Sequence, residues 1–487
     1  MLQRVGHWLK KHEPPVWFLW LLIVVLILRI PSLFEPYSYG DEMIYLTLGN
    51  AVRRGITLYK YVHDNKPPLL YLLAGISGNL MMFKVILGFW SLATIYLYFR
   101  LMSLLSKNNT LIKVATVAFA LLTTIPTFEG NIANAEVFMV GPTLLAIILL
   151  LKDKTTIKDL LFAGLLFAVA VLFKFPAIFD IPVIFLFWLA TNQKPIKQLF
   201  TSGAIVFVGF AILVLGTVSY YFAKGAGPEY LVAAFLQNLG YVSSWTAHAE
   251  VSFWQKNGGL IIRFGILVLL TLGLFIKRHS IKKDFLFFSF WLVFALFAVA
   301  LSERPYPHYF VQALPATAYF LALLFTNKSI YQVISVLPLS LAVFVLVYFK
   351  FWYYPTAPYY SRFIKYVLRQ SDKKTYYQAF DSKLPTYYQI SEKVVAETQP
   401  SDPVLVWGDV PTIYALSKRL PSIKYVAGYH INDFYGWDRV LADITARPPK
   451  LIVLEERFQN EKILTFLKDH YGFVAFFEGF QIWKFVQ

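Results

Sequence analysis

The chain has 487 residues, of which 57% are hydrophobic and only 15% are charged. A soluble core of this size does not need apolar blocks of membrane-spanning length, so a soluble globular protein is excluded. The formal net charge is +17, but the basic residues lie mainly in short segments between apolar blocks. This is the positive-inside pattern of a membrane protein, so nucleic acid is not an expected partner. The sequence contains no cysteine, which excludes disulfides, thiolate metal sites and cysteine nucleophiles.

The first apolar block runs from Val16 to Ile30 and follows Arg4, Lys10 and Lys11. No small-residue cleavage site comes after it, so we interpret it as a retained first helix that starts in the cytoplasm. With roughly 20 apolar residues per crossing, the sequence predicts an integral, multi-pass protein of the cell membrane with about 11 transmembrane helices. They are expected near 16–34, 85–105, 111–128, 137–151, 159–174, 177–190, 199–222, 258–277, 284–301, 308–326 and 330–350.

Two apolar stretches resist a simple count of crossings. The stretch 69–82 is short, and we interpret it as a helix that lies in the membrane interface. The stretches 159–174 and 177–190 are separated by Lys174-Phe175-Pro176, which indicates two short or broken crossings. A count of roughly 10 to 13 crossings therefore stays open.

An odd number of crossings places the loop 35–84 and everything after about residue 351 on the extracytoplasmic side. The chain thus divides into a transmembrane domain, 1–350, and a small soluble α/β domain, 351–487, in which strand and helix patterns alternate. Strands are expected at 404–407, 451–454, 473–477 and 480–485, with helices near 411–418, 432–446 and 459–470. Gly408-Asp409 follows a strand without a glycine-rich fingerprint, so we interpret it as a turn. We expect this domain to bind an acceptor or to stabilise the protein, not to catalyse.

Two adjacent carboxylates, Asp41 and Glu42, stand just after the first predicted helix. Charged side chains beside a membrane are costly where water is thin, so a functional role competes here with that of a solvated loop. Farther along the same loop, the sequence Lys-Pro-Pro-Leu from Lys66 leads into an apolar run. The two prolines restrict the backbone beside Lys66 and favour a fixed position for its side chain.

The Asp-Glu pair, the amphipathic stretch with Gly55 and the Lys-Pro-Pro-Leu sequence together resemble the first extracytoplasmic loop of GT-C glycosyltransferases. More narrowly, they are similar to the protein O-mannosyltransferase and aminoarabinose transferase families. The resemblance implies sugar transfer from a polyprenyl-phosphate donor, with a first-loop aspartate that acts at the transferred sugar. By position it assigns that role to Asp41, with Glu42 beside it. The carboxy-terminal region differs from that of the eukaryotic protein mannosyltransferases, so a protein acceptor is not implied.

Looser matches to these families lie farther along the chain. Glu136 stands where they carry a second acidic residue, with Glu129 as a rival. The Lys-Phe-Pro sequence at Lys174 resembles a Lys-x-Pro feature at a mid-chain break. The segment that begins at Arg304 and includes His308 resembles a His-Tyr segment that opens a late helix in bacterial members.

The chemistry of such a transfer requires both cations and a carboxylate. Displacement of a polyprenyl phosphate leaves growing negative charge on the phosphate oxygens, while the attacking hydroxyl must lose a proton. Candidates for the phosphate are Lys66, Arg304, His308 and Lys174, and candidates for the catalytic carboxylate are Asp41, Glu42 and Glu136. A divalent metal ion could be held by Asp41, Glu136 and His308, but whether a metal is required stays open.

Other roles for three of these cations stay open as well. The side chain of Lys66 could extend to lipid head groups, which is common for lysine beside a membrane. Lys174 could pair with Asp180 or reach the surface, because an isolated ammonium inside a membrane is costly. His308 could belong to an aromatic belt at the interface.

The sequence therefore predicts an inverting, polyprenyl-phosphate-dependent glycosyltransferase that acts on a lipid, glycan or protein acceptor on the extracytoplasmic side, with inversion implied by the family. A transporter or flippase for a lipid-linked sugar is the first alternative, because intramembrane charges and broken helices also occur there. It is disfavoured because no internal repeat is evident and the charges lie in loops. A structural or receptor protein is the second alternative, but it leaves Asp41, Glu42 and Lys66 without a role. The sequence does not fix the sugar or the acceptor.

Overall fold

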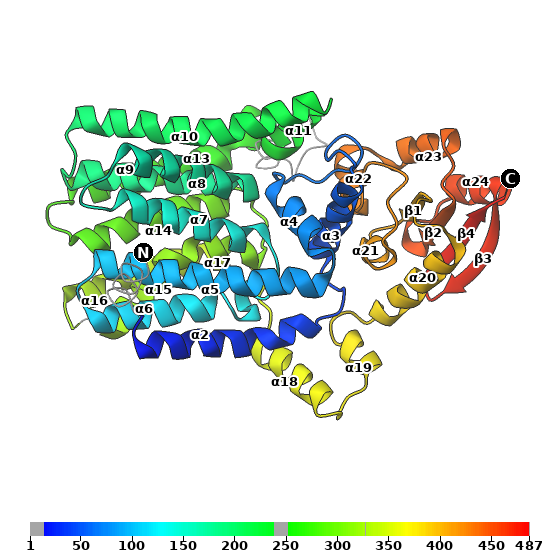
Figure 1. Cartoon of the computed structure of the whole chain (residues 1–487), viewed down its shortest axis with the longest axis horizontal. Coiled ribbons are helices and arrows are strands. Elements are labelled where there is room, and N and C mark those ends of the chain that lie inside the picture. Colours follow the sequence, from blue (N-terminus) through cyan, green and yellow to red (C-terminus); the bar gives the residue numbers. More distant parts are fainter. Residues whose placement is uncertain (1–13, 238–251, 327, 487) are drawn as a thin grey trace, which may run out of the picture.

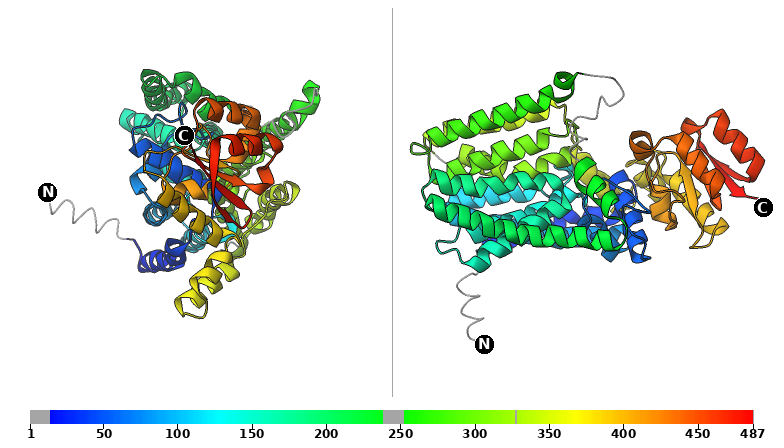
Figure 2. Two further views of the ribbon diagram at one scale, coloured as in Figure 1. Left: turned by 90° about the vertical axis from the view of Figure 1, so that its right-hand side faces the viewer. Right: turned by 90° about the horizontal axis from the view of Figure 1, so that it is seen from above.

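The computed structural model describes residues 14–237, 252–326 and 328–486. A bundle of helices fills most of the molecule, and a mixed α/β unit lies at one end of the bundle (Figure 1). The right-hand view of Figure 2 shows bundle helices side by side along the long axis of the molecule, and the left-hand view looks down that axis. The bundle helices are α2 (Val16–Arg29), α5 (Leu80–Leu105), α6 (Asn109–Leu122), α7 (Ala135–Leu150), α8 (Ile157–Phe173), α9 (Ile181–Ala190), α10 (Ile196–Ala223), α13 (Phe253–Ile276), α14 (Lys283–Ala300), α15 (Leu314–Thr326), α16 (Ile330–Ile334) and α17 (Val336–Tyr348).

Every predicted transmembrane position carries a helix, so the apolar blocks located these helices correctly. Within the described residues, 7 helices are long and apolar enough to cross a membrane, and 3 apolar helices are shorter. The long ones are Val16–Phe34, Leu80–Leu105, Ile196–Ala223, Asn257–Ile276, Lys283–Ala300, Pro307–Thr326 and Ile330–Tyr348. The chain is thus a multi-pass membrane protein, while the predicted total of crossings stays a prediction. The first basic residues, Arg4, Lys10 and Lys11, lie outside the described residues, so the orientation stays a prediction too.

Short 3-10 segments interrupt or extend several bundle helices. The break predicted at Lys174 is confirmed, because α8 ends at Phe173 and a 3-10 segment follows before α9. The predicted interface helix 69–82 is shorter than expected. Gly78, with a φ of 68°, ends α4 (Leu69–Ser77), and the Asn79 side chain then caps α5 by accepting from the backbone of Met82. The 3-10 segments are η1 (Ile30–Phe34), η2 (Pro126–Phe128), η3 (Phe175–Asp180) and η6 (Pro307–Ala313), and α11 (Gly227–Leu231) continues into the π-helical η4 (Val232–Leu236).

The loop that follows the first helix folds into two packed helices between the bundle and the α/β unit (Figure 1). These helices are α3 (Gly40–Arg53) and α4, and they approach closely at Gly49 and Gly75. A Cβ atom on Gly49 would lie only 2.5 Å from the backbone nitrogen of Gly75, so this contact requires glycine. The loop is therefore a rigid part of the fold, and it fixes Asp41 in the first turn of α3.

The α/β unit contains one four-stranded sheet with the order β1-β2-β4-β3. β1 (Val404–Trp407) runs parallel to β2 (Leu451–Glu455), whereas β4 (Phe480–Phe485) is antiparallel to both β2 and β3 (Tyr471–Phe477). The predicted helix near 432–446 is in fact two helices, because Gly436 adopts a φ of 93° between them. The helices of this region are α18 (Thr356–Val367), α19 (Lys373–Gln378), α20 (Leu384–Glu397), α21 (Thr412–Ser417), α22 (Gly428–Phe434), α23 (Trp437–Ala446) and α24 (Glu461–His470).

The α/β unit makes direct hydrogen bonds to the first loop. The guanidinium of Arg54 donates to the backbone oxygens of Pro400 at 2.7 Å and Lys418 at 2.6 Å. The backbone nitrogen of His63 donates to the oxygen of Lys424 at 2.9 Å. These bonds join segments that are far apart in the sequence, so the α/β unit is held against the loop that carries Asp41. The predicted division of the chain at residue 350 stays a prediction.

A buried ion triad holds the base of the first loop against the bundle. Lys84 Nζ lies 2.8 Å from Glu35 Oε2 and 2.8 Å from Glu42 Oε1. The side chains of all three residues are at most 4% exposed. Glu35 also accepts from Asn131 Nδ2 at 2.6 Å, and Glu42 accepts from the backbone of Ala133 at 2.7 Å. Two buried carboxylates thus depend on one lysine for their charge compensation.

We expect Lys84→Met to destabilise the protein by about 3 kcal/mol or more, because it leaves Glu35 and Glu42 buried together without a cation. Thermal unfolding of the purified protein in detergent measures the effect. Lys107→Met, which removes an exposed lysine from a connecting segment, is the control and should leave the Tm unchanged. Equal Tm values for the two variants would contradict the stabilising role of the triad.

Candidate active site

A cavity of about 1040 Å³ lies where the bundle, the first loop and the α/β unit meet. Its polar wall includes Tyr39, Asp41, Lys66, Glu136, Lys174, Arg304 and His308. A second wall is apolar and comes from α13 and α14, with Leu260, Ile261, Phe264, Phe297, Ala298 and Val299. A third wall comes from the α/β unit, with Asp409, Tyr429, His430, Asp433 and Phe434. The cavity therefore combines cations, carboxylates and a hydrophobic surface.

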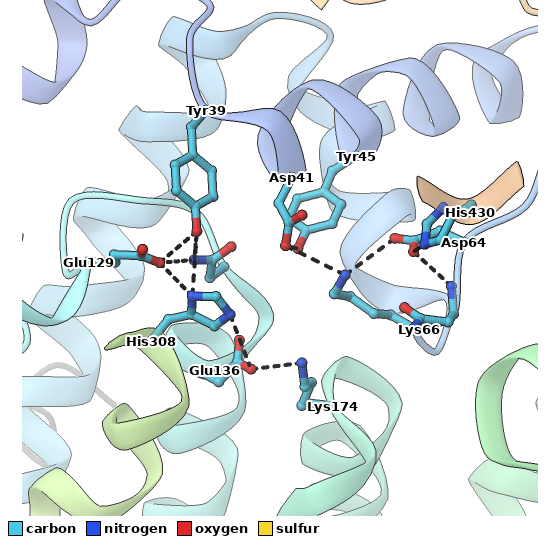
Figure 3. Close-up of polar contacts among 12 residues, drawn as sticks. Tyr39, Asp41, Tyr45, Asp64, Lys66, Glu129, Glu136, Lys174, His308 and His430 are labelled. Carbon is cyan, nitrogen blue, oxygen red and sulfur yellow. Dashed lines mark hydrogen bonds and ion pairs between the residues drawn. The ribbon is translucent and has the colours of Figure 1, made fainter. Parts of the chain in front are cut away.

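Lys66 lies between two carboxylates of the first loop (Figure 3). Its Nζ is 3.7 Å from Asp41 Oδ2 and 3.5 Å from Asp64 Oδ2. Tyr45 donates from its hydroxyl to Asp41 Oδ2 at 2.9 Å, and Tyr71 donates to Asp64 Oδ2 at 2.8 Å. Asp41 also stands in the first turn of α3, where the helix dipole favours negative charge. The sequence Asp64-Asn65-Lys66 thus fixes the cation that faces Asp41.

The neighbouring cations keep both carboxyl groups ionised at neutral pH. Burial raises the pKa of Asp41, but Lys66 and His308 together outweigh it, so the pKa lies below its ordinary value of 3.8. Burial also acts against ionisation of Asp64, yet Lys66 and the hydrogen bond from Tyr71 lower the pKa of that group well below its ordinary value. Asp41 is therefore available as a proton acceptor at neutral pH.

A second chain of polar contacts runs along the polar wall (Figure 3). Tyr39 donates from its hydroxyl to Glu129 Oε2 at 2.7 Å, and His308 Nδ1 lies 2.5 Å from the same oxygen. His308 Nε2 is 4.0 Å from Glu136 Oε1, which in turn pairs with Lys174 Nζ at 2.8 Å. This chain joins the first loop, η2, α7, η3 and η6, so it ties the mid-chain and late segments to the cavity.

The structure brings all but one of the predicted site residues to the cavity. Those that line it are Asp41, Lys66, Glu136, Lys174, Arg304 and His308. Glu42 does not line this cavity, although it is adjacent to Asp41 in the sequence. Its carboxylate lies on another side of α3, where it pairs with Lys84. Adjacent helical residues point in different directions, so Glu42 contacts Lys84 while Asp41 lines the cavity, and the expected catalytic role of Glu42 stays a prediction that this placement does not support.

The positions of Lys66, Lys174 and His308 in the structure bear on the other roles considered for them. Lys174 pairs with Glu136, whereas Asp180 Oδ1 accepts from Trp291 Nε1 at 3.0 Å. The side chain of Lys66 is only 10% exposed, so it does not extend to the surface. His308 is 3% exposed and faces carboxylates instead of lipid. All three residues line the cavity.

The residues expected to hold a metal ion do not form a ligand group. Asp41 pairs with Lys66, and Glu136 pairs with Lys174, so each carboxylate already faces an ammonium. Among residues 14–237, 252–326 and 328–486, no cluster of at least three His, Asp or Glu side chains is placed to hold a metal.

Sequence reasoning missed two residues that shape this site. Asp64 stands two positions before Lys66, and that spacing alone gave no reason to prefer it over other acidic residues. Its complete burial beside a lysine and a tyrosine is visible only in the structure. His430 comes from the α/β unit, more than 350 positions after Asp64 in the sequence, and its Nε2 lies 3.4 Å from Asp64 Oδ1.

Comparisons with known proteins bear on the family and the fold of the chain. A family model described as dolichyl-phosphate-mannose-protein mannosyltransferase matches residues 65–221, a segment that contains Lys66, Glu136 and Lys174 and begins after Asp41. The fold is similar to that of ArnT from Cupriavidus metallidurans bound to undecaprenyl phosphate, with a TM-score of 0.56 and 13% identity over 96% of this chain and 97% of that chain. The structure of ArnT in the apo state gives a TM-score of 0.53 and 12% identity, with the same coverage of 96% and 97%. No curated protein sequence matches the chain.

The resemblance predicted from the first loop is thereby confirmed. The chain has a helical membrane fold similar to that of ArnT, together with a small carboxy-terminal sheet domain. The family match supports the same relationship in the segment that follows the Asp-Glu pair. At 12–13% identity the structural likeness shows the fold and not the reaction, because one fold can carry different chemistries.

His63 lies at the contact between the first loop and the α/β unit. Its ring packs with the rings of Tyr425, Phe434 and His430 at centroid distances of 5.1, 5.9 and 6.1 Å. Burial, together with His430 and Lys424, lowers the pKa of His63 to about 3. The folded protein therefore keeps this ring neutral at pH values at which an unfolded histidine takes up a proton.

We expect acid to destabilise the protein through His63. Because the pKa of His63 is lowered, protonation of this residue does not reduce the free energy of unfolding above pH 6.5. As the pH falls from 6.5 toward 3, the free energy of unfolding decreases, by about 2 kcal/mol at pH 5. His63→Phe keeps an aromatic ring but cannot titrate, so its Tm should fall less between pH 6.5 and 5. His279→Phe, which changes an exposed histidine, should follow the wild type. A His63→Phe curve parallel to that of the wild type would refute this role.

Proposed function

We propose that the protein is an inverting glycosyltransferase that moves a sugar from a polyprenyl-phosphate donor to an acceptor hydroxyl. The observation that carries the proposal is the placement of an ionised Asp41 beside Lys66 in a cavity that also holds further cations and an apolar wall. A base, phosphate-binding groups and a surface for a lipid chain are the three elements that this reaction needs.

In this mechanism the oxygen of the acceptor hydroxyl bonds to the anomeric carbon of the donor sugar. Asp41 accepts the proton that this hydroxyl loses. The bond from that carbon to the phosphate oxygen breaks in the same displacement, and the configuration at the carbon inverts. The ion pair with Lys66 makes Asp41 a weak base in the resting site. A donor phosphate that draws Lys66 toward itself would weaken this pair and raise the basicity of Asp41 when the substrate is in place.

The leaving phosphate carries the charge that the site must stabilise. Lys66, Lys174 and Arg304 line the same cavity and supply positive charge to its oxygens. Glu136 holds Lys174, and Glu129 faces His308, so the cations are positioned before the substrate arrives. Such preorganisation lowers the reorganisation that the transition state requires.

The apolar wall suits the polyprenyl chain of the donor. Leu260, Phe264 and Phe297 come from α13 and α14, both of which are candidate membrane spans. A lipid tail between these helices would remain in contact with the hydrocarbon layer while its phosphate reaches the polar wall. The similar ArnT structure was solved with undecaprenyl phosphate, which supports a polyprenyl phosphate as the donor class. With the predicted orientation, the cavity opens on the extracytoplasmic side.

The test measures transfer from a panel of radiolabelled polyprenyl-phosphate sugars to membrane acceptors by the purified protein. We expect wild type to consume one donor and Asp41→Asn to lower turnover at least about a hundredfold, because the general base is lost. Lys66→Ala should raise the KM for the donor more than it lowers turnover, because it removes a phosphate contact. Both variants should be folded, as shown by thermal unfolding, and Lys107→Ala should behave as wild type.

Two results would contradict the proposal. If no donor is consumed while lipid-linked sugar crosses the bilayer of reconstituted vesicles, the transporter hypothesis replaces it. If transfer occurs but the product retains the anomeric configuration of the donor, measured by NMR coupling constants, single displacement is wrong.

A further inference from the structure

The wall that the α/β unit adds to the cavity differs in chemistry from the polar wall. It carries Asp409 and Asp433, the aromatic side chains of Tyr429 and Phe434, and the imidazole of His430. The opposite side holds the ammonium and guanidinium groups that suit a phosphate. A carboxylate and aromatic surface is unsuited to an anion but well suited to hydroxyl groups and to the apolar faces of sugar rings.

Helix α22 is fixed in its place over the cavity by the end of β1. Asp409 Oδ1 accepts from the backbone nitrogen of Gly428 at 2.9 Å, at the start of the helix. A Cβ atom on Gly428 would lie 2.7 Å from the backbone oxygen of Gly408, so glycine is required for this approach. The Gly408-Asp409 sequence is therefore more than the predicted turn, because it anchors the helix that carries His430.

His430 reaches from this helix to the charged groups of the first loop (Figure 3). It is 2% exposed, and its Nε2 lies 3.4 Å from Asp64 Oδ1. Asp64, the partner of His430, contacts Lys66, and Lys66 contacts Asp41. Two ion-pair contacts therefore connect Asp64 to Asp41, the proposed base. Nδ1 of His430 is buried and has no hydrogen-bond partner in the described part of the chain.

The protonation state of His430 determines whether its Nδ1 accepts or donates a hydrogen bond. Burial lowers the pKa of the ring, although Asp64 opposes the shift, so the imidazole is neutral at pH 7. The carboxylate of Asp64 favours a proton on Nε2, which leaves a lone pair on Nδ1. His430 lines the cavity, and its buried Nδ1 without a partner is a hydrogen-bond acceptor that a substrate hydroxyl can satisfy.

We propose that α22 forms the acceptor subsite and that it binds the hydroxyl groups of a saccharide, with Nδ1 of His430 accepting a hydrogen bond from the sugar. The inference rests on the proposed function and names the acceptor class of the same site. Asp433 accepts from further hydroxyls, and Phe434 offers a ring face for stacking. The saccharide, whether free or on a lipid carrier, thereby presents a hydroxyl toward Asp41 from the side opposite the donor phosphate.

The test uses the full-length protein in lipid nanodiscs and an array of neutral, phosphorylated and carboxylated oligosaccharides. We expect wild type to bind neutral saccharides in preference to the anionic ones. His430→Phe, which keeps the ring but removes both nitrogens, should weaken that binding at least about tenfold. His430→Asn, which keeps a polar atom near the position of Nδ1, should retain most of it. His470→Phe changes an exposed histidine of the same domain and should have no effect.

A second readout separates this inference from the donor site. Binding of undecaprenyl phosphate, measured by the shift in Tm, should be the same in His430→Phe and wild type, while Lys66→Ala weakens it and keeps saccharide binding. Neutral saccharide binding that is equal in wild type and His430→Phe would overturn the inference, as would a preference for anionic saccharides. If undecaprenyl phosphate does not bind wild type and no donor is consumed, the proposed function itself fails. Binding of neutral saccharides that depends on His430 would support the subsite even then.

Discussion

The ion pairs of Lys66 with Asp41 and Asp64 are the interaction on which the site depends. A buried lysine between two carboxylates leaves one net negative charge, which the adjacent tyrosine hydroxyls and the His430 ring surround. Removal of Lys66 would leave two carboxylates facing each other without a cation, so the lysine fixes the loop as well as the chemistry. The same lysine is the group that a phosphate would attract, and substrate binding is therefore coupled to the basicity of Asp41.

The position of these charges explains why the α/β unit is held so closely to the bundle. Charged groups at the end of a helix bundle interact weakly if water reaches them and strongly if it does not. The backbone bond from His63 to Lys424 and the bonds from Arg54 bring α22 over the first loop. The domain thus completes the enclosure of a site whose proposed base and cations come from the membrane part of the chain. The Lys84 triad supports the same loop from beneath.

The site could be predicted from the sequence only in part, and the reason differs from residue to residue. Asp41 was predicted from the resemblance of the first loop, Lys66 from the two prolines that follow it, and Lys174 because an isolated ammonium between apolar runs is costly. Glu42 was included because it is adjacent to Asp41, but a helix turns adjacent side chains to different sides and gives it to Lys84. Asp64 and His430 carry no local signal, because a contact between them requires two segments that are distant in the sequence to meet.

The sequence by itself determined the class of fold. Apolar blocks of helical length located every helix of the bundle, because a helix that crosses lipid needs a long run of apolar residues. The alternating pattern after residue 351 located the four strands, because burial in a sheet imposes a regular spacing of apolar residues. Only the tertiary structure decided which charges meet. It showed that Lys174 pairs with Glu136 and not with Asp180, and that α22 covers the cavity. Electrostatic contacts between distant segments depend on distances that no local sequence pattern records. The positions of the helices could therefore be predicted from the sequence, whereas the contacts of the site are visible only in the tertiary structure.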